Sequence, residues 1–584
     1  MRVSWYFYNL FKTWFTFFVI SKLFFVLVNL QNSWSDLGEF PLVWWNGLRL
    51  DLSIMGYIFI LPLLLLIIKK YVKSFPNIFF KIYNWLVFSF LLLISTTDPY
   101  FYKYWGQKCN LSFTQFLGKE NAGLVSIATM DYIVALIFAT VFVMFFKKRW
   151  LHKLAPPKNI SIGPIILFLI LSFLMLRGGW SKIPINISSA FYSNVNFYNY
   201  AALNPTWNLL ATEFEKDKHK PLKLLESEKE ALDIWHKKPH GEADIKHLLR
   251  KDSNSNILLI VLESFSAKTS DYLSGKTFAS TPNLDGIMAK GITYSNAYAS
   301  SFRSDKGLLA LTMGVPSGAR QTLTNFPQHI NDKPNVFGLF DNAYNTSFYY
   351  GGNMEFANIK ILFSQANQVN EQSDFNQNNS NAWGVHDEVV FDKFYNDFIN
   401  EDKPQFKMLF SLSSHEPFDV PGYQKKSNPY LNSISYTDSC LGVLFNKLQN
   451  SDKWDNTLII LTADHGTIRP DKSPVFDKES FRIPIVLTGG IVQKDTLIKD
   501  VVSQIDIPQT IALFKESDTQ FNIQNSLLKP SGVAFYSYYA GLAMVQNNGE
   551  QYFDFGQKKY LSDTVDLPLE KAYYHLTNKY FFNY

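Results

Sequence analysis

The apolar residues of this chain follow two patterns, and the change between them lies near residue 180. Before this point, apolar segments approach the roughly 20 residues that a helix needs to cross a bilayer. After it, apolar residues occur in short runs with the length of buried strands. We therefore predict a transmembrane domain over residues 1–180 with about five helices. Their apolar segments lie at 10–30, 46–68, 82–97, 132–147 and 161–178.

The loops between these segments differ in basic residues, which predicts the orientation of the domain. Lysine and arginine gather in two loops, 69–81 and 147–158. Because cytoplasmic loops carry the excess of these residues, we expect the N-terminus inside the cell. Five crossings then place the chain after Trp180 outside the cytoplasmic membrane, whereas an even number of helices would reverse this. The first segment has no clear cleavage site of small residues, so we expect a retained helix and not a signal peptide.

Two polar features stand out in the membrane half. Arg49 and Asp51 fall early in the second apolar segment. Charges at such positions pair within a helix bundle, line a polar pathway or extend to the interface from a helix end. The stretch 98–105 (DPYFYKYW) has the composition of an aromatic belt at the membrane interface.

The second half of the chain is more polar, and the spacing of its apolar residues differs from that of the first half. Residues 181–250 carry no long apolar run, and residues 214–250 are dense in charge, so we interpret this region as a solvated helical linker. Over residues 251–584, short apolar runs alternate with helix-like segments, which is typical of an α/β domain with a mostly parallel sheet. The expected strands are 256–262, 345–350, 406–411, 457–462 and 483–487, and the expected helices include 384–399 and 433–450.

Composition adds limits on the class of protein. Aromatic residues make up 16% and charged residues 18% of the chain, which fits a protein with a membrane part. The net charge of +5 is too small to indicate binding of nucleic acid. The two cysteines, Cys109 and Cys440, lack metal-site spacing. A disulfide between them is not expected if one lies in a membrane loop and the other in a soluble domain.

Ligand-type side chains follow two of the predicted strands. Glu263 comes directly after strand 256–262, and Asp464 and His465 come directly after strand 457–462. The carboxyl ends of parallel strands are where α/β sheets place their sites. The two strand ends together therefore suggest a metal site. The alternative is two ordinary strands whose polar ends cap helices.

Two further residues are candidates for chemistry. Ser304 stands at the start of a helix-like run, where free N–H groups and the helix dipole favour anions. A serine in this position is a nucleophile or a plain N-cap. His415 follows a strand in a loop bounded by prolines, where it binds phosphate, protonates a leaving group or only packs the loop.

Together, these side chains make a mixed donor set of three oxygen atoms and one imidazole: Glu263, Ser304, Asp464 and His465. Such a set suits Mn²⁺ or Zn²⁺ better than Ca²⁺. A serine bound to such an ion loses its proton more easily, which makes it a usable nucleophile at neutral pH.

The order of four motifs resembles the lipoteichoic acid synthase type of phosphoglycerol transferase, within the alkaline phosphatase and sulfatase superfamily. The motifs are NILLIVLESFS (256–266), FRSDKG (302–307), SSHEPFD (413–419) and TADHG (462–466). The resemblance covers essentially the whole chain. It implies a multi-pass α-helical membrane domain followed by an external α/β alkaline phosphatase-like (sulfatase-type) domain with a mostly parallel sheet. SISYTDSCLG (433–442) and QIDIPQT (504–510) resemble further helical signatures of that family.

The resemblance also implies roles for individual residues. It makes Ser304 the nucleophile that holds a covalent phosphoglycerol, as well as a metal ligand. His415 would bind the substrate phosphate or assist the leaving group. Arg303 is a candidate for contact with phosphate because of its position beside the nucleophile, and the resemblance assigns it no role. The implied cofactor is one divalent metal, Mn²⁺ first, with Zn²⁺ or Mg²⁺ as alternatives. Its other ligands would be Glu263, Asp464 and His465.

The sequence departs from the family in two places. The best-known members use Thr as the nucleophile, whereas this chain has Ser304, a conservative chemical change. The family's glycerol-phosphate pocket carries a Trp and an Arg, and this chain has Ala357 and Ile359 at those places. These departures leave the head group open, while the metal chemistry is not affected. The local candidates for head-group contacts are Asn353, Glu355, Phe356 and Asn358.

We therefore expect a metal-dependent transferase of the cytoplasmic membrane with its catalytic domain on the extracytoplasmic (periplasmic) side. It would move a phosphoglycerol-type head group from a phospholipid donor, phosphatidylglycerol, to a glycan or polymer acceptor through a covalent serine intermediate.

Three alternatives stay open to different degrees. A phosphoethanolamine transferase has the same fold, but relatives of the lipid A-modifying type usually carry several disulfides. A sulfatase needs Pro and then Arg after its nucleophile, whereas Ser304 is followed by Asp-Lys-Gly. A non-catalytic membrane protein that binds or scaffolds is disfavoured by the complete ligand set.

Overall fold

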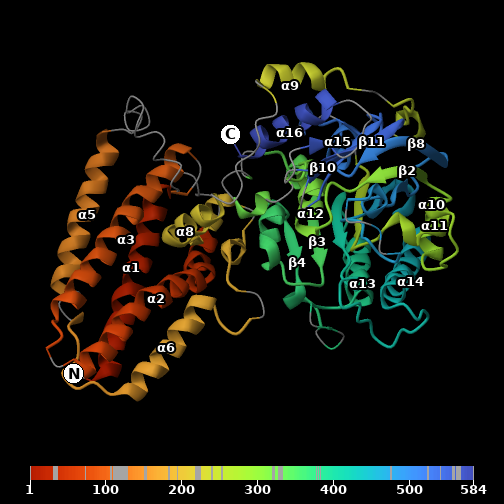
Figure 1. Cartoon of the computed structure of the whole chain (residues 1–584). Coiled ribbons are helices and arrows are strands. Elements are labelled where there is room, and N and C mark those ends of the chain that lie inside the picture. Colours follow the sequence, from red (N-terminus) through yellow and green to blue (C-terminus); the bar gives the residue numbers. More distant parts are fainter. Residues whose placement is uncertain are drawn as a thin grey trace. The chain divides into compact units, whose positions relative to one another are not determined.

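The computed structural model divides into two compact units, Met1–Lys218 and His219–Tyr584, which are described separately (Figure 1). The residues predicted to form a linker are shared between them, because those up to 218 belong with the membrane helices and the rest with the α/β domain. The structure describes residues 2–30, 37–72, 74–105, 108–109, 129–149, 154–181, 184–193, 195–216, 225, 227–238, 241–250, 254–318, 322–326, 330, 333–376, 378, 380–381, 383–471, 473, 476–521, 525–538, 541–554, 559–560 and 567–582.

Four helices of the first unit are long and apolar enough to span a membrane, among the residues described. They are α1 (Val3–Val28), α2 (Phe40–Tyr71), α3 (Ile78–Trp105) and α5 (Thr129–Arg149). The fifth predicted segment forms α6 (Ile162–Arg177), a shorter apolar helix of 16 residues. At 1.5 Å per residue it is about 24 Å long, less than the roughly 30 Å of a hydrocarbon core. All five segments are therefore helical, but α6 falls short of spanning length.

The segment after α6 folds onto these helices and is not a free linker. It contains η5 (Ile187–Ala190), α7 (Asn196–Ala202) and α8 (Pro205–Lys216). Helices α7 and α8 both contact α2. Asn208 on α8 donates a hydrogen bond to the carbonyl of Cys109. These contacts explain why the first unit extends beyond residue 180.

Two buried ion pairs lie where α1 and α3 finish and α2 begins. Lys22 on α1 contacts Asp51 on α2 at 2.5 Å, and the second oxygen of Asp51 accepts a hydrogen bond from Asn204 at 2.8 Å. Lys108 contacts Asp98 on α3, also at 2.5 Å. All four charged side chains are buried. The polar groups of this half thus pair inside the bundle.

These contacts bear on two predictions for this region. Asp51 pairs within the bundle, which is one of the alternatives predicted, and Arg49 donates to the carbonyl of Gly178 at 3.4 Å. The stretch 98–105 is the last part of α3, where Tyr100 and Phe101 are buried. The aromatic belt at the membrane interface stays a prediction.

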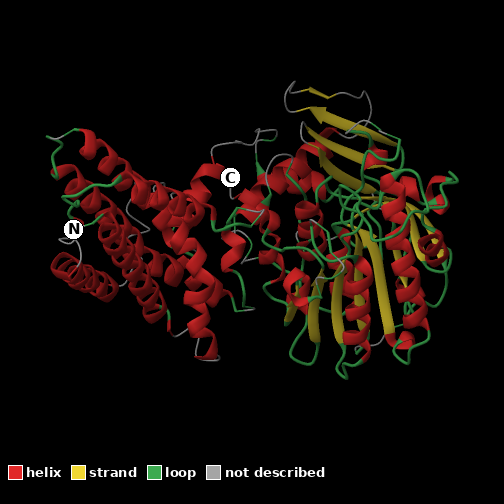
Figure 2. Cartoon of the chain, turned by 90° about the horizontal axis from the view of Figure 1, so that it is seen from below, coloured by secondary structure: helices red, strands yellow, loops and turns green. Residues whose placement is uncertain are grey.

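The second unit is built on an eight-stranded sheet in the order β4-β3-β5-β1-β6-β7-β2-β8 (Figure 2). The strands are β1 (Asn256–Leu262), β2 (Ile292–Tyr298), β3 (Asn345–Tyr350), β4 (Gln368–Asn370), β5 (Gln405–Phe410), β6 (Thr457–Ala463), β7 (Ile485–Thr488) and β8 (Thr496–Ser503). Only β7 runs antiparallel to its neighbours. The mostly parallel sheet is therefore confirmed, and the five predicted strands are all present. Strands β2, β4 and β8 were not predicted.

Helices connect and cover these strands. They are α10 (Asp271–Ser274), α11 (Pro282–Met288), α12 (Ser304–Met313), α13 (Asp387–Ile399), α14 (Pro429–Gln449) and α15 (Asp506–Phe514). The family-like segment 433–442 lies in α14, where Asp438 accepts hydrogen bonds from the N–H groups of Asn283 and Leu284 and so caps α11. Segment 504–510 leads into α15. Both cysteines are buried and free, as expected.

A second, antiparallel sheet was not predicted. Its strands are β9 (Val533–Tyr538), β10 (Gly541–Gln546), β11 (Gly549–Asp554) and β12 (Lys559–Tyr560). Helices α9 (Glu228–Trp235) and α16 (Leu567–Phe582) pack together beside it. Tyr573 of α16 stacks on Phe535 with ring centroids 3.7 Å apart, which attaches the helices to the sheet.

A buried glutamate in α16 predicts a pH-dependent stability. Glu570 accepts a hydrogen bond from Gln551 at 2.6 Å, and burial raises its pKa to about 8. In the unfolded chain the pKa is near 4.5, so the stability from this group is full below pH 4.5 and is lost as the pH rises toward 8. The Glu570→Gln variant should remove up to about 1.4 kcal/mol per pH unit of this dependence. Denaturant unfolding of both proteins from pH 5 to 9 measures it, and parallel curves would contradict the prediction.

Candidate metal centre and catalytic cavity

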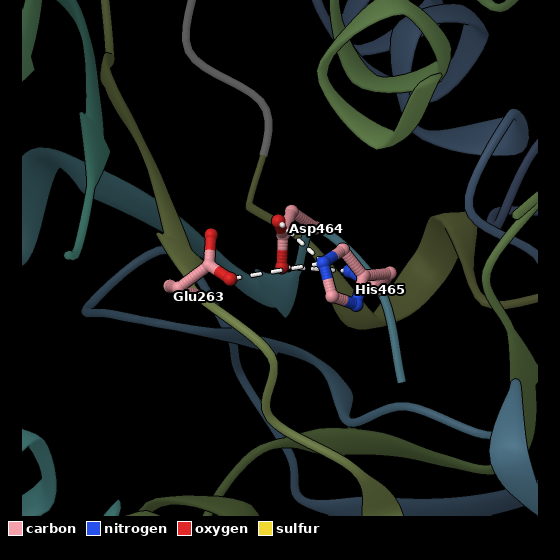
Figure 3. Close-up of side chains that lie close together, drawn as sticks. All are labelled: Glu263, Asp464 and His465. Carbon is pink, nitrogen blue, oxygen red and sulfur yellow. Dashed lines mark hydrogen bonds and ion pairs between the residues drawn. The ribbon is translucent and has the colours of Figure 1, made fainter. Parts of the chain in front are cut away.

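The two central strands bring their polar ends to one edge of the sheet. Strands β1 and β6 are parallel neighbours with Leu262 opposite Ala463, and every residue of both strands is buried. Glu263 and Asp464 therefore leave the sheet side by side, and His465 follows (Figure 3). This is the arrangement that the sequence pattern predicts.

Glu263, Asp464 and His465 form a cluster that can hold a metal ion. One ligand atom from each lies within 4.8 Å of the others. His465 Nε2 is 3.4 Å from Asp464 Oδ2 and 3.7 Å from Glu263 Oε1. Figure 3 shows the three side chains converging on one point. Their exposed fractions are 2% for Glu263 and 0% for Asp464, so the carboxylates are shielded from water.

Ser304 completes the cluster from a different element. It is the first residue of α12, and its Oγ lies 3.2 Å from Glu263 Oε2 and 3.4 Å from His465 Nε2. Three residues on, a Cβ at Gly307 would collide with the carbonyl of Asp464. The glycine thus lets the first turn of α12 lie directly against the end of β6. The structure brings the serine to the cluster, as the sequence predicts.

The electrostatics of the cluster fit a bound cation. Burial and the negative charge of Glu263 raise the pKa of Asp464. Burial acts in the same direction on Glu263, but His465, His415 and hydrogen bonds with Ser264 and Asp464 together lower its pKa. Asp464 Oδ2 is buried without a hydrogen-bond partner in the described part of the chain. An orphaned carboxylate oxygen in such a place is costly unless a cation or proton meets it. The donor set, two carboxylates with an imidazole and a hydroxyl, is one that divalent transition metals accept.

Neighbouring polar groups hold the ligands in position. His465 Nδ1 lies 2.8 Å from the carbonyl of Gly466, so a proton on Nδ1 leaves Nε2 with its lone pair toward the carboxylates. Asp464 Oδ1 accepts hydrogen bonds from the N–H groups of Ser264 and His465. Gln504 donates to the carbonyl of Asp464, which gives the 504–510 segment a structural role at the site.

A cavity of about 330 Å³ opens over the cluster. Arg303 and His415 both line it, together with Glu263, Ser304 and His465. His415 Nδ1 lies 2.7 Å from the carbonyl of Glu416, and the imidazole packs against Trp383 with ring centroids 4.3 Å apart. The predicted serine, arginine and histidine therefore share one cavity with the predicted ligands.

The loop that carries His415 is fixed by a residue that sequence reasoning missed. Asp387, at the start of α13, accepts hydrogen bonds from the N–H groups of Leu412 and Ser413 and from the hydroxyl of Thr437. The N–H of His415 in turn donates to the carbonyl of Leu412. The only sequence signal for Asp387 is its position near the start of the predicted helix 384–399, which an acidic residue at any ordinary helix start shares.

Other cavity residues were also missed. Arg469 contacts Glu416 at 2.6 Å, and its guanidinium lies 5.0 Å from the ring centroid of Phe418. The remaining lining residues that were not predicted are Ser264, Phe302, Asp305, Tyr430 and Thr467. They come from loops and from the first turns of α12 and α14, whose packing depends on the fold, so no spacing in the sequence identifies them.

Three of the predicted head-group contacts, Asn353, Glu355 and Asn358, do not line this cavity. Asn358 belongs to η11 (Phe356–Phe363), has a φ of 59° and does not line the cavity described above. Phe356 opens the same element, and its side chain falls outside the described part of the structure. Asn353 uses its side-chain oxygen to accept the N–H of Glu355 within the turn. The role of this segment in substrate binding stays a prediction.

The part of the chain that carries this site is similar to known proteins. Residues 255–513 match the family model described as Sulfatase. The chain is 19% identical over 315 residues to "Lipoteichoic acid synthase-like YvgJ" of Bacillus subtilis (strain 168), covering 48% of this chain and 51% of that protein. It is 22% identical over 263 residues to "Phosphoglycerol transferase I" of Xanthomonas axonopodis pv. citri (strain 306), covering 39% and 36%. The matches thus span about half or less of these relatives.

A solved structure shows the same fold. The chain is similar to a protein in the alkaline phosphatase superfamily from Vibrio parahaemolyticus, with a TM-score of 0.53 and 24% identity, over 62% of this chain and 97% of that one. Residues 255–513 therefore match the Sulfatase family model and have an alkaline phosphatase-like fold. Among the residues described, four apolar helices of membrane-spanning length precede them in the chain.

Proposed function

We propose that this chain is a membrane-anchored, metal-dependent transferase that moves a phosphoglycerol-type head group from phosphatidylglycerol to a hydroxyl group of a glycan or polymer. The observation that carries the proposal is the place of Ser304 Oγ, within 3.4 Å of both Glu263 and His465 and beside a cavity. The similarity of the sulfatase-family domain to phosphoglycerol transferases supports the same class of chemistry.

The metal would be held by Glu263, Asp464 and His465, with Ser304 as the fourth ligand. Mn²⁺ is the first choice for this mixed oxygen and nitrogen set, and Zn²⁺ or Mg²⁺ are alternatives. A bound divalent ion would favour the deprotonated serine and offset the negative charge of the phosphate. The buried carboxylates keep this charge arrangement away from water.

The first step would transfer the head group to the protein. Ser304 Oγ attacks the lipid phosphorus, an Oγ–P bond forms, and the bond from phosphorus to the diacylglycerol oxygen breaks. His415 lines the cavity with Nδ1 directed at a carbonyl, so its Nε2 is the nitrogen left to give the departing oxygen a proton. Arg303 would contact the phosphoryl oxygens. Diacylglycerol leaves with the proton.

The second step would pass the group to the acceptor. An acceptor hydroxyl attacks the phosphorus, the Oγ–P bond breaks, and the hydroxyl proton is taken up by His415 Nε2, which restores its starting state. The route predicts ping-pong kinetics because donor product leaves before acceptor reacts. Phe356 and Asn358 remain our proposed contacts for the part of the substrate beyond the cavity.

The proposed location is the outer side of the cytoplasmic membrane. If α6 crosses the bilayer as a fifth helix, despite its length of 16 residues, an inside N-terminus places the catalytic domain on the extracytoplasmic side. Mismatched short helices are accommodated by local thinning of the bilayer. Lipid donors and envelope glycans would both be within reach there.

Intact mass of the detergent-purified chain tests the function directly. We expect a glycerophosphate-sized adduct after incubation with phosphatidylglycerol and Mn²⁺, and no adduct on the Ser304→Ala variant, because the variant lacks the attacking oxygen. The matched control is Ser301→Ala, a buried serine three residues earlier that does not line the cavity.

Other results would change the proposal. An adduct that forms only with phosphatidylethanolamine would identify the phosphoethanolamine transferase instead. No adduct with either lipid, in a protein that binds the metal, would leave a hydrolytic or binding role and would contradict the transferase.

A further inference from the structure

The nucleophile is flanked by three charged residues whose surroundings differ. Arg303 precedes Ser304 as the N-cap residue of α12, and Asp305 and Lys306 follow it. Arg303 and Asp305 line the cavity. Lys306 does not, because its side chain is buried and its ammonium donates to the carbonyl of Gly318. Arg303 is therefore the cation of this segment that can meet a substrate.

Arg303 and Asp305 form an asymmetric ion pair. Arg303 Nε lies 3.0 Å from Asp305 Oδ1, and the exposed fractions of the two side chains are 53% and 2%. Asp305 Oδ2 is buried and has no hydrogen-bond partner among the residues described. A buried carboxylate that is left without its cation is costly, so Asp305 holds Arg303 more firmly than an exposed pair would.

The atom used in this contact leaves the rest of the guanidinium available. Arginine has five N–H donors in a planar fork, and Nε supplies one of them. Within the described part of the chain, no hydrogen bond from Nη1 or Nη2 of Arg303 is present. A guanidinium that is already held at Nε loses less conformational entropy when its terminal nitrogens bind an anion. The other arginine of the cavity, Arg469, differs because a terminal nitrogen is already bound to the exposed Glu416.

We infer that Asp305 is a positioning residue that holds Arg303 by Nε, so that both terminal nitrogens of the guanidinium meet the oxygens of a phosphoryl group at Ser304. The inference rests on the proposed phosphoryl transfer for its role in turnover. The geometry itself concerns recognition of a tetrahedral oxyanion, which can be measured without turnover. Asp305 would touch no substrate and act only through Arg303.

A double-mutant cycle on the full-length, detergent-purified protein with Mn²⁺ tests this coupling. The variants are Arg303→Ala, Asp305→Asn and the two combined. The first readout is the dissociation constant of orthovanadate by calorimetry, and the second is kcat/KM for bis(p-nitrophenyl) phosphate. We expect Arg303→Ala to weaken vanadate binding about 10- to 100-fold and Asp305→Asn about 10-fold. Asp305→Asn should add nothing in the Arg303→Ala background.

The matched control is Asp506→Asn. Asp506 is also a buried carboxylate in the first turn of a helix, with one oxygen that has no partner among the described residues, but it does not line the cavity. It should leave vanadate affinity unchanged. An equal loss of vanadate affinity in Asp506→Asn and Asp305→Asn would overturn the inference. So would a loss from Asp305→Asn by the same factor with and without Arg303→Ala. The inference would also be overturned if Asp305→Asn left vanadate affinity unchanged.

The two readouts separate this inference from the proposed function. A coupled effect on vanadate binding in a protein that forms no lipid adduct would support the positioning role and contradict the transferase. Additive effects in a protein that does form the adduct would overturn only the positioning role.

Discussion

The Asp464→Asn variant should lose its metal and at least about 10³-fold in turnover. The substitution keeps the size of the side chain, and an amide oxygen can still accept the N–H groups of Ser264 and His465. It replaces the buried oxygen that has no partner within the described residues, and it removes one negative charge from the cluster. Metal content by plasma mass spectrometry after dialysis, measured beside turnover of phosphatidylglycerol, checks the prediction.

A surface carboxylate provides the comparison. Asp495 lies in the exposed turn before β8, and Asp495→Asn should keep one metal per chain and full turnover. Asp464→Asn protein that retains both its metal and its activity would show that the carboxylate is not a ligand. Loss of activity with full metal content would place Asp464 in contact with substrate instead.

The Lys22→Met variant should lower the free energy of unfolding of the membrane unit by about 3–5 kcal/mol. The substitution leaves Asp51 charged and buried between helices, with Asn204 as its remaining hydrogen-bond donor among the described residues. The double variant Lys22→Met/Asp51→Leu should recover most of this loss, since no buried charge is then left without a partner. Denaturation in detergent micelles, followed by tryptophan fluorescence, gives the difference.

An exposed lysine at the end of α2 controls for the loss of a positive charge. Lys70→Met should change the free energy of unfolding by less than about 0.5 kcal/mol because Lys70 is exposed. Equal destabilisation by both single variants would argue against a specific role for the buried pair. A double variant no more stable than Lys22→Met would argue that Lys22 stabilises the bundle through packing alone.

The cluster of Glu263, Asp464 and His465 could be predicted because its residues follow local rules. Glu263 and Asp464 each come directly after a strand with a continuous apolar run, and adjacent parallel strands end at one edge of the sheet. The only assumption was that the two strands are neighbours. Ser304 reaches the cluster only because α12 packs against the end of β6. Gly307, which permits this close approach, lies in the same FRSDKG motif as the serine.

The missed strands have mixed sequences for a physical reason. Strand β2 (ITYSNAY) has polar residues at its half-buried positions beside β8, and β8 contains Lys499 and Asp500. Asp500 accepts N–H groups from Glu242 and Ala243, far away in the sequence. A strand that contacts loops and a second sheet buries polar groups in hydrogen bonds, so its apolar pattern is interrupted.

The loop residues of the cavity could not be predicted by the same rules. Arg469 and Phe418 lie about fifty residues apart and meet because their loops follow β6 and β5, which flank β1. Asp387 likewise contacts a loop that begins more than twenty residues later. Neither contact leaves a period or a spacing in the sequence.

The pairing of Lys22 with Asp51 also bears on how the protein enters the membrane. On its own, α1 would carry a lysine among lipid chains, and α2 an aspartate. The cost of such a charge reaches about 2.5–3.5 kcal/mol at the middle of a helix and is smaller toward the helix ends, where Lys22 and Asp51 lie. If the two helices insert together, Lys22 and Asp51 neutralise each other's charge before either side chain meets lipid. The first two helices therefore suit release from the translocation machinery as one hairpin, with the nascent chain held until Asp51 has emerged and found its partner.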